Sequence, residues 1–176
     1  MDPAILDTQA VFDKFPDEPA LNALTDLAAA AKYDRQELTI TVARENIIAA
    51  CEAVKAAGYN FLEDVTAVDW YPSEPRFQIS YSILSFSLKR RVRLVVRLVG
   101  DDASLDSITG VWPSANFYER EVFDLFGVIF EGHSDLRRIM LPEDWVGYPL
   151  RKDYVEQEEY DGISTQRAPL VEKLLR

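Results

Sequence analysis

The chain has 176 residues, of which 48 % are hydrophobic and 28 % charged, and this length suits one globular domain with extensions. Its formal net charge of −11 argues against nucleic acids and anionic membrane surfaces as partners, because both attract basic proteins. No apolar run approaches the roughly 18 residues of a membrane span, and the acidic N-terminus is typical of neither a signal nor a transit peptide, so we expect a cytosolic protein.

The first part of the chain predicts an arm, a helix, a strand and a second helix. Prolines punctuate residues 1–18, which we interpret as an N-terminal arm. Residues 19–32 carry an apolar stripe at helical spacing, and residues 37–42 alternate as a strand with one buried face does. Residues 44–57 predict a helix with Cys51 on its apolar face, followed by Gly58 at a left-handed C-terminal cap.

Three further strands are predicted at residues 61–69, 76–83 and 91–99. The last two alternate cleanly, which favours antiparallel pairing with one solvated face. We therefore expect an α+β fold over residues 19–126. It would be a two-layer domain whose mixed or mostly antiparallel sheet of about four strands carries two helices on one face.

A row of arginines marks the outward side of the last strand, at Arg91, Arg93 and Arg97. A solvated sheet face explains such a row most simply. The alternative is a docking patch for an acidic partner, or for acidic residues of the chain itself.

Residues 117–126 predict one more helix, which ends at Gly127. Asn116 and Glu119 have the spacing of a capping-box variant. Arg120 and Asp124 have the i,i+4 spacing of a helix ion pair.

The most informative part of the sequence is residues 112–154, and residues 127–176 are predicted to be an extended partner-binding C-terminal segment. Glycines and prolines exclude long helices and central strands there, yet aromatic, aliphatic and arginine residues continue through it. Exposed apolar side chains forgo about 25 cal/mol per Å² of buried area. We therefore expect these side chains to pack against the domain or against a partner, in the mixture of aromatic and arginine residues typical of interfaces.

A spaced series of residues between 118 and 154 forms a recognisable signature. Its first part is Tyr118-Glu-Arg-Glu-x-x-Asp124-x-x-Gly127-x-x-Phe130-x-x-His133-x-Asp135-Leu-Arg-Arg-Ile139. Its second part is Pro142-x-x-Trp145-x-Gly147-x-Pro-Leu-Arg-Lys-Asp-Tyr154. Together with Leu62-x-Asp64-Val-Thr-Ala-Val-Asp69, the series resembles the hydrophilic thirty-kilodalton subunit of respiratory complex I, the NADH:quinone oxidoreductase.

Four positions depart from the pattern of that family. Ser134 and Val155 stand where proline is usual, Tyr148 where histidine is usual, and Phe117 in the area of a common tryptophan. These changes weaken a role for histidines in proton chemistry. They keep the aromatic character that an interface needs.

The resemblance implies a subunit without redox centres in the peripheral arm, on the cytoplasmic side of the bacterial inner membrane. It would pack against the large quinone-site subunit, with flavin and iron–sulfur clusters in partner subunits, and its tail from residue 155 would become ordered on a neighbour. A related membrane-bound hydrogenase or cofactor dehydrogenase complex is the alternative setting. The partner-interface residues that we predict are Glu119, Arg120, Glu121, Asp124, His133, Asp135, Arg137, Arg138, Trp145, Tyr148, Arg151, Lys152, Asp153 and Tyr154.

Residue counts agree with the absence of a redox centre. One cysteine, Cys51, and one histidine, His133, cannot supply a disulfide, or the four ligands of a usual iron–sulfur or zinc site. The carboxylates Glu119, Glu121 and Asp124 could form a catalytic set, but capping and ion pairing explain them more simply. We likewise favour hydrogen bonding over base catalysis for His133, and ion pairing over phosphate binding for Arg137 and Arg138.

Overall fold

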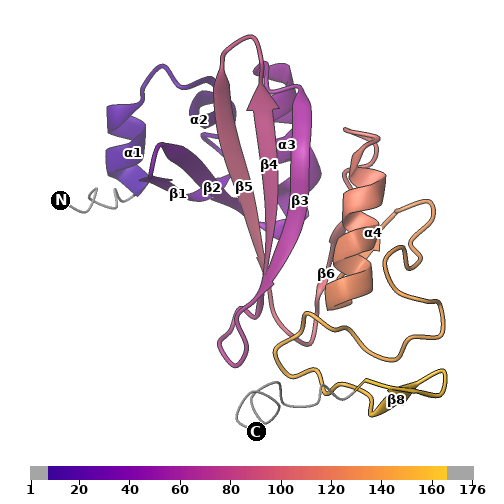
Figure 1. Cartoon of the computed structure of the whole chain (residues 1–176). Coiled ribbons are helices and arrows are strands. Elements are labelled where there is room, and N and C mark those ends of the chain that lie inside the picture. The colour runs from indigo at the N-terminus through magenta and orange to yellow at the C-terminus, as the bar shows by residue number, and fades with distance from the viewer. Residues whose placement is uncertain (1–7, 166–176) are drawn as a thin grey trace, which may run out of the picture.

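The computed structural model describes residues 8–165 and has the predicted α+β fold (Figure 1). Its centre is a five-stranded sheet in the order β1-β2-β5-β4-β3. The strands are β1 (Ala28–Asp34), β2 (Glu37–Val42), β3 (Phe61–Asp69), β4 (Phe77–Ser85) and β5 (Arg90–Leu98). Strands β2 and β5 pair in parallel and the other pairs are antiparallel, so the predicted mixed sheet is confirmed.

The predicted helix over residues 19–32 is wrong. Helix α2 spans only Pro19–Ala23, and the chain continues into β1, which pairs with β2 along most of its length. Leu21 and Leu24, which suggested a long apolar stripe, are both buried by this short helix and its cap. The alanines that follow favour a helix intrinsically, but pairing with β2 outweighs that weak preference. The sheet therefore has five strands instead of about four.

Residues interpreted as an N-terminal arm contain helix α1 (Thr8–Lys14), which packs against β1. Val11 is fully buried, and the Thr8 hydroxyl accepts a hydrogen bond from the Ala31 amide at 3.1 Å. This part of the chain consequently belongs to the folded unit. Residues 1–7 of the predicted arm lie outside the described residues.

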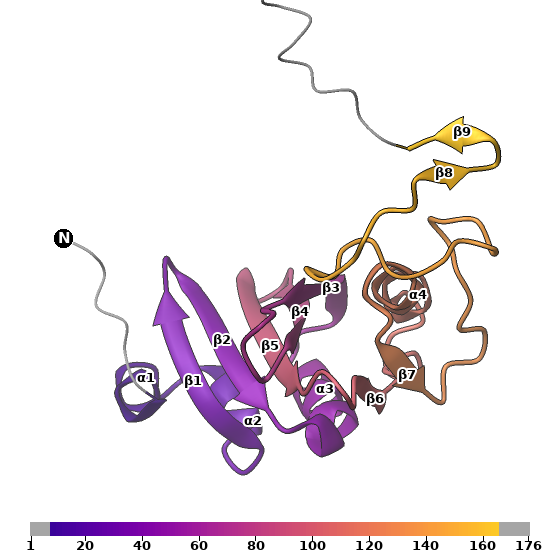
Figure 2. The ribbon, with the colours of Figure 1, turned by 90° about the horizontal axis from the view of Figure 1, so that it is seen from below.

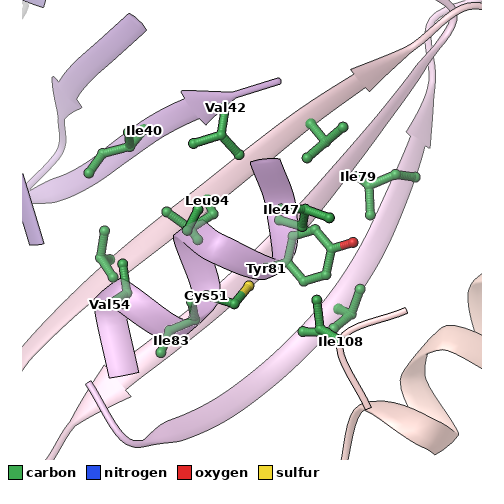
Figure 3. Close-up of a cluster of buried hydrophobic side chains, with 14 of the residues drawn as sticks. Ile40, Val42, Ile47, Cys51, Val54, Ile79, Tyr81, Ile83, Leu94 and Ile108 are labelled. Carbon is green, nitrogen blue, oxygen red and sulfur yellow. The ribbon is translucent and has the colours of Figure 1, made fainter. Parts of the chain in front are cut away.

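Helices α2 and α3 (Ile47–Ala56) lie on one face of the sheet (Figure 2), as predicted, and α3 follows the short 3₁₀ helix η1 (Arg44–Asn46). Figure 3 shows the side chains of α3 that face the strands, among them Ile47, Cys51 and Val54. Burial raises the pKa of the Cys51 thiol, so this cysteine is an inert part of the core. Gly58 follows the helix with φ of +100°, as the predicted cap requires.

The arginine row lies on the outward sheet face and is largely paired within the chain. Arg93 donates to Glu37 at 2.6 Å, and Arg91 donates to Glu63 at 2.8 Å. Arg97 lies over the Trp70 ring, 6.0 Å from its centroid. Of the two functional alternatives, the chain's own acidic residues account for Arg91 and Arg93.

Helix α4 (Ala115–Phe126) packs against β3, at the edge of the sheet far from β1 (Figures 1 and 2). The short strands β6 (Ser104–Asp106) and β7 (Ile129–Glu131) pair in parallel before and after it. The chain then runs irregularly, as predicted, to a small hairpin of β8 (Glu159–Tyr160) and β9 (Ile163–Ser164). This hairpin lies in the tail from residue 155 that was expected to become ordered on a neighbour, and residues 166–176 of that tail lie outside the described residues. Helix α4 is therefore the support on which the C-terminal segment is arranged.

Candidate partner-binding surface

Asp124, a buried carboxylate of α4, holds the chain that follows β7. Its Oδ1 accepts a hydrogen bond from Arg138 at 2.6 Å. Its Oδ2 accepts three more, from the consecutive backbone amides of residues 139, 140 and 141, at 3.0, 2.7 and 2.9 Å. Burial raises the pKa of this carboxyl, but these donors outweigh burial and the pKa stays below its ordinary value. Asp124 therefore fixes a loop, and the predicted i,i+4 ion pair with Arg120 is wrong.

The Arg138 guanidinium extends this contact to the next turn of the segment. It donates to the carbonyls of Trp145 and Gly147, both at 3.0 Å, and lies 5.3 Å from the centre of the Tyr148 ring. From the other side, Arg120 donates to the carbonyls of residues 137 and 138 at 3.2 Å. Backbone groups that have no helix or strand partners are thereby satisfied by two arginines.

Arg151 closes the C-terminal end of α4. Its Nε donates to the Phe126 carbonyl at 2.5 Å, and its guanidinium lies 4.7 Å from the centre of the Tyr148 ring. Burial is the main cause that lowers the pKa of Arg151. Gly127 allows this arrangement because its φ is +71° and because a Cβ there would clash with Tyr148 and Arg151.

A second ionic cluster joins the segment to the sheet. Arg76 binds Asp69 through two hydrogen bonds of 2.8 and 2.9 Å, and it also binds Asp153 at 2.5 and 3.0 Å. Asp69 accepts from the Lys152 amide as well, at 2.8 Å. Burial raises the pKa of Asp69, but the bonds from Arg76 and from two backbone amides bring it down to about 2. The sequence analysis did not predict Asp69 and Arg76 as site residues. Asp69 could have been noticed, because it is a carboxylate at a buried position of the apolar strand β3.

Glu119 serves neither as a cap nor as part of a carboxylate pair. Helix α4 begins after Ser114, so the capping box predicted for Asn116 is wrong. Glu119 is fully buried and accepts hydrogen bonds from the Ser107 hydroxyl and the Ile108 amide, at 2.7 and 2.8 Å. Burial outweighs these bonds and raises its pKa to about 7.

The other predicted residues differ in exposure. His133 has the predicted hydrogen-bonding role: its Nδ1 accepts from the Asp135 amide at 3.0 Å, so its Nε2 is the donor to the Asn116 carbonyl at 3.2 Å. Arg137 is exposed, and its one ion-pair partner among the described residues is Asp135. The rings of Trp145 and Tyr154 are half-buried, and the Glu121 side chain and the Lys152 ammonium have no hydrogen bond or ion pair within residues 8–165.

The surface of this region carries apolar side chains on a fixed backbone. Among residues 132–165 the exposed large apolar side chains are Ile139, Met140, Val146, Leu150, Val155 and Ile163. Within residues 8–165 no group of His, Cys, Asp and Glu side chains is arranged to hold a metal ion. No helix of that range is long and apolar enough to cross a membrane. The exposed apolar side chains on this fixed backbone make the segment a candidate binding surface.

Replacing Arg138 tests whether its bonds with Asp124 and with the backbone order the segment. The neighbouring Arg137 is a matched control. We expect Arg138→Ala to cost about 3–5 kcal/mol, because it leaves the Asp124 charge buried and unpaired. We expect Arg137→Ala to cost less than about 1 kcal/mol, because its ion pair is exposed. Urea unfolding and limited proteolysis of residues 127–155 measure both effects. Equal stability and equal cleavage of the two variants would contradict the assignment.

The raised pKa of Glu119 predicts a pH-dependent stability. An acid whose folded pKa exceeds its unfolded pKa stabilises the fold below the unfolded value, and this contribution is lost as the pH rises through the folded value. We expect the parent chain to lose up to about 1.4 kcal/mol per pH unit, relative to Glu119→Gln, between about pH 5 and pH 7. Urea titrations at several pH values measure the difference, and parallel curves for parent and variant would refute the expectation.

Several proteins of known identity are similar to this chain. Residues 40–160 match the protein family described as Respiratory-chain NADH dehydrogenase, 30 Kd subunit. One NADH-quinone oxidoreductase subunit, from Geotalea uraniireducens, is 46 % identical over 136 residues, which cover 74 % of this chain and 83 % of that protein. The subunit of the same name from Geobacter sulfurreducens is 48 % identical over 134 residues, covering 73 % and 83 %.

Two solved structures share the fold. A trypsin-resistant fragment (1-134) of Nqo5 is 37 % identical and superposes with a TM-score of 0.54 over 57 % of this chain and 83 % of the fragment. A chain of the membrane-bound sulfane sulfur reductase, an archaeal respiratory membrane complex, is 28 % identical, with a TM-score of 0.67 over 76 % and 82 %. The family match includes α4, the Asp124–Arg138 pair and most of the segment that follows. The chain therefore belongs to the 30 kDa subunit family of respiratory-chain NADH dehydrogenase.

Proposed function

We propose that this chain is a structural and assembly subunit of the peripheral arm of a proton-translocating NADH:quinone oxidoreductase. It packs against the large quinone-site subunit and has no catalytic site of its own. Family membership supports the general role. The observation that carries the specific role is the C-terminal segment, which offers exposed apolar side chains on a backbone held by buried ion pairs.

Several large apolar side chains of this segment are more than half exposed to solvent. Met140 is 65 % exposed, Val146 67 % and Val155 84 %. Burial of such side chains contributes about 25 cal/mol per Å² of apolar area. The backbone beneath them is already fixed by Asp124, Arg138 and Arg151. Binding a partner would therefore cost little conformational entropy for ordering this segment, and most of the free energy of apolar burial would remain. The segment is therefore suited to a stable contact with another protein of the complex.

The predicted interface residues divide into two roles under this proposal. Glu121, Asp135, Arg137 and Lys152 are exposed and would meet the partner directly, together with His133, Trp145, Tyr148 and Tyr154 at the half-buried positions. The side chains that bind the segment or hold it on the domain would act by keeping it in shape, and they are Arg120, Asp124, Arg138, Arg151 and Asp153. Glu119 would act one step earlier, because its bonds to Ser107 and Ile108 hold α4 itself. Because the two roles differ, substitutions in the first set should affect assembly without unfolding the chain.

Ile139→Glu tests the assembly role, and Ile48→Glu is a matched control. Both isoleucines are 38 % exposed, but Ile48 lies on α3, away from the segment. We expect Ile139→Glu to reduce the amount of assembled complex at least about tenfold, because a buried unpaired charge at an interface costs more than about 1.4 kcal/mol. Native gels with NADH oxidation staining measure the complex, and circular dichroism confirms that both variants fold.

The proposal fails if the Ile139→Glu complex forms at the parental level but turns over slowly. That result would show that the segment affects catalytic turnover and not assembly. It also fails if Ile48→Glu reduces assembly equally, because the effect would then not be specific to the segment.

The proposal includes the cofactors and the location. Flavin and iron–sulfur clusters would reside in partner subunits, and the complex would lie on the cytoplasmic side of the bacterial inner membrane. We expect the purified chain to show no flavin or iron–sulfur absorbance, because an iron–sulfur cluster usually needs about four thiolates and the chain has one cysteine. A stoichiometric visible chromophore retained through purification would contradict this part.

A related complex is the alternative function. The sulfane sulfur reductase chain aligns with 76 % of this chain. This similarity supports the alternative that the chain is the equivalent subunit of a membrane-bound hydrogenase or cofactor dehydrogenase complex. The NADH-quinone oxidoreductase relatives at 46 % and 48 % identity favour the NADH-linked enzyme. Affinity purification of the native chain with mass spectrometry of its partners separates the two, because only the NADH-linked enzyme would bring a flavin-bearing NADH-oxidising subunit.

A further inference from the structure

A cavity of about 540 Å³ lies at the β1 side of the sheet, at the opposite edge from α4. Its walls come from the end of α1, the loop before α2, β1, β2 and the turn that leads into β5. Its volume is within the range of roughly 300–1,000 Å³ that is usual for binding pockets. The proposed contact with the quinone-site subunit does not involve this part of the molecule.

The cavity is lined by four basic and two acidic side chains in a chain whose net charge is −11. The acidic Glu18 is already paired with Arg90 at 2.8 Å and accepts a hydrogen bond from Tyr59. Lys14 and Lys89 form no hydrogen bond or ion pair within the described range 8–165. Two ammonium groups are therefore available to an anionic ligand.

An apolar surface lies beside these charges. The rings of Phe15 and Tyr33 pack with their centroids 4.5 Å apart, and Leu38 lines the same cavity. The Lys14 ammonium is 5.5 Å from the centres of both rings, so the cationic and aromatic groups form one continuous surface. A ligand that matches it would combine a negative charge with an apolar side chain.

We propose that this cavity binds an acidic, leucine- or phenylalanine-bearing segment of a second partner protein, with its carboxylates at Lys14 and Lys89. Phosphate ligands fit less well, because the cavity has no glycine-rich loop whose amides could cradle a phosphate. An anionic lipid surface fits less well too, because Asp17 and Glu18 line the same cavity and the whole chain is acidic. The assembly would then hold this subunit at both edges of its sheet.

Fluorescence anisotropy with the full chain tests the proposal. The probe is a fluorescein-labelled octapeptide that alternates aspartate and leucine, and its partner probe replaces every aspartate with asparagine. We expect saturable binding of the aspartate peptide that weakens about fivefold or more in Lys14→Glu and in Lys89→Glu, because losing a partly exposed ion pair costs up to about that factor and the reversed charge adds repulsion of the aspartates. Lys32→Glu, on β1 but outside the cavity, is the matched control and should change the affinity less than about twofold.

Three outcomes would overturn the proposal. One is equal binding of the aspartate and asparagine peptides. Another is equal weakening by Lys32→Glu, which would indicate a diffuse charge effect. The third is binding to phosphatidylglycerol vesicles without binding to the peptide, which would identify a lipid surface as the ligand. Because the peptide assay requires no assembled complex, its result is independent of the native-gel test of the α4 side.

Discussion

The pairing of buried carboxylates with arginines is the interaction on which the C-terminal half of this protein depends. Asp124 collects four hydrogen bonds and Asp69 also accepts four, and in both cases one donor is an arginine and others are backbone amides. A backbone interrupted by prolines and turn glycines pairs only some of its amides and carbonyls with each other. Charged side chains replace the missing secondary structure, and they do so from a helix and a strand that the core already fixes.

Arginine suits this role because its planar guanidinium can donate in several directions at once. Arg138 reaches the side chain and carbonyl of Asp124 and two further carbonyls of the segment. Tyr148 lies between Arg138 and Arg151 and covers Gly127. A lysine could not make this set of contacts, because its ammonium is a single point of charge. The result is a segment without regular structure that is nevertheless held in one arrangement.

Strands β2 to β5 and helix α3 could be predicted from the sequence because their side chains alternate or repeat with a clear period. Residues 77–85 and 90–98 illustrate this, since inward and outward positions matched burial almost throughout. The helix over residues 19–32 failed because leucines and alanines fit a helical stripe, whereas long-range pairing of β1 with β2 decided the outcome. Local pattern could not reveal that pairing.

The candidate site was found from the sequence, but the partners of its charges were not. Residues 118–154 identified the family and the segment, yet Asp124 pairs with Arg138 and Arg76 pairs with Asp153, which are 14 and 77 positions apart. The apolar residues were expected to need cover from the domain or a partner, and the domain covers only some of them. Phe130 is buried in the chain itself, whereas Met140 and Val146 remain exposed and support the proposed contact.

Amide hydrogen exchange of the isolated chain tests the central claim most directly. If Asp124 and Arg138 order the segment without a partner, the amides of Ile139, Met140 and Leu141 should exchange at least about a hundredfold more slowly than in an unfolded peptide, which corresponds to an opening free energy of about 2.7 kcal/mol. Exchange of these three amides at the unfolded rate would contradict the account, because the segment would then be ordered only by its neighbours.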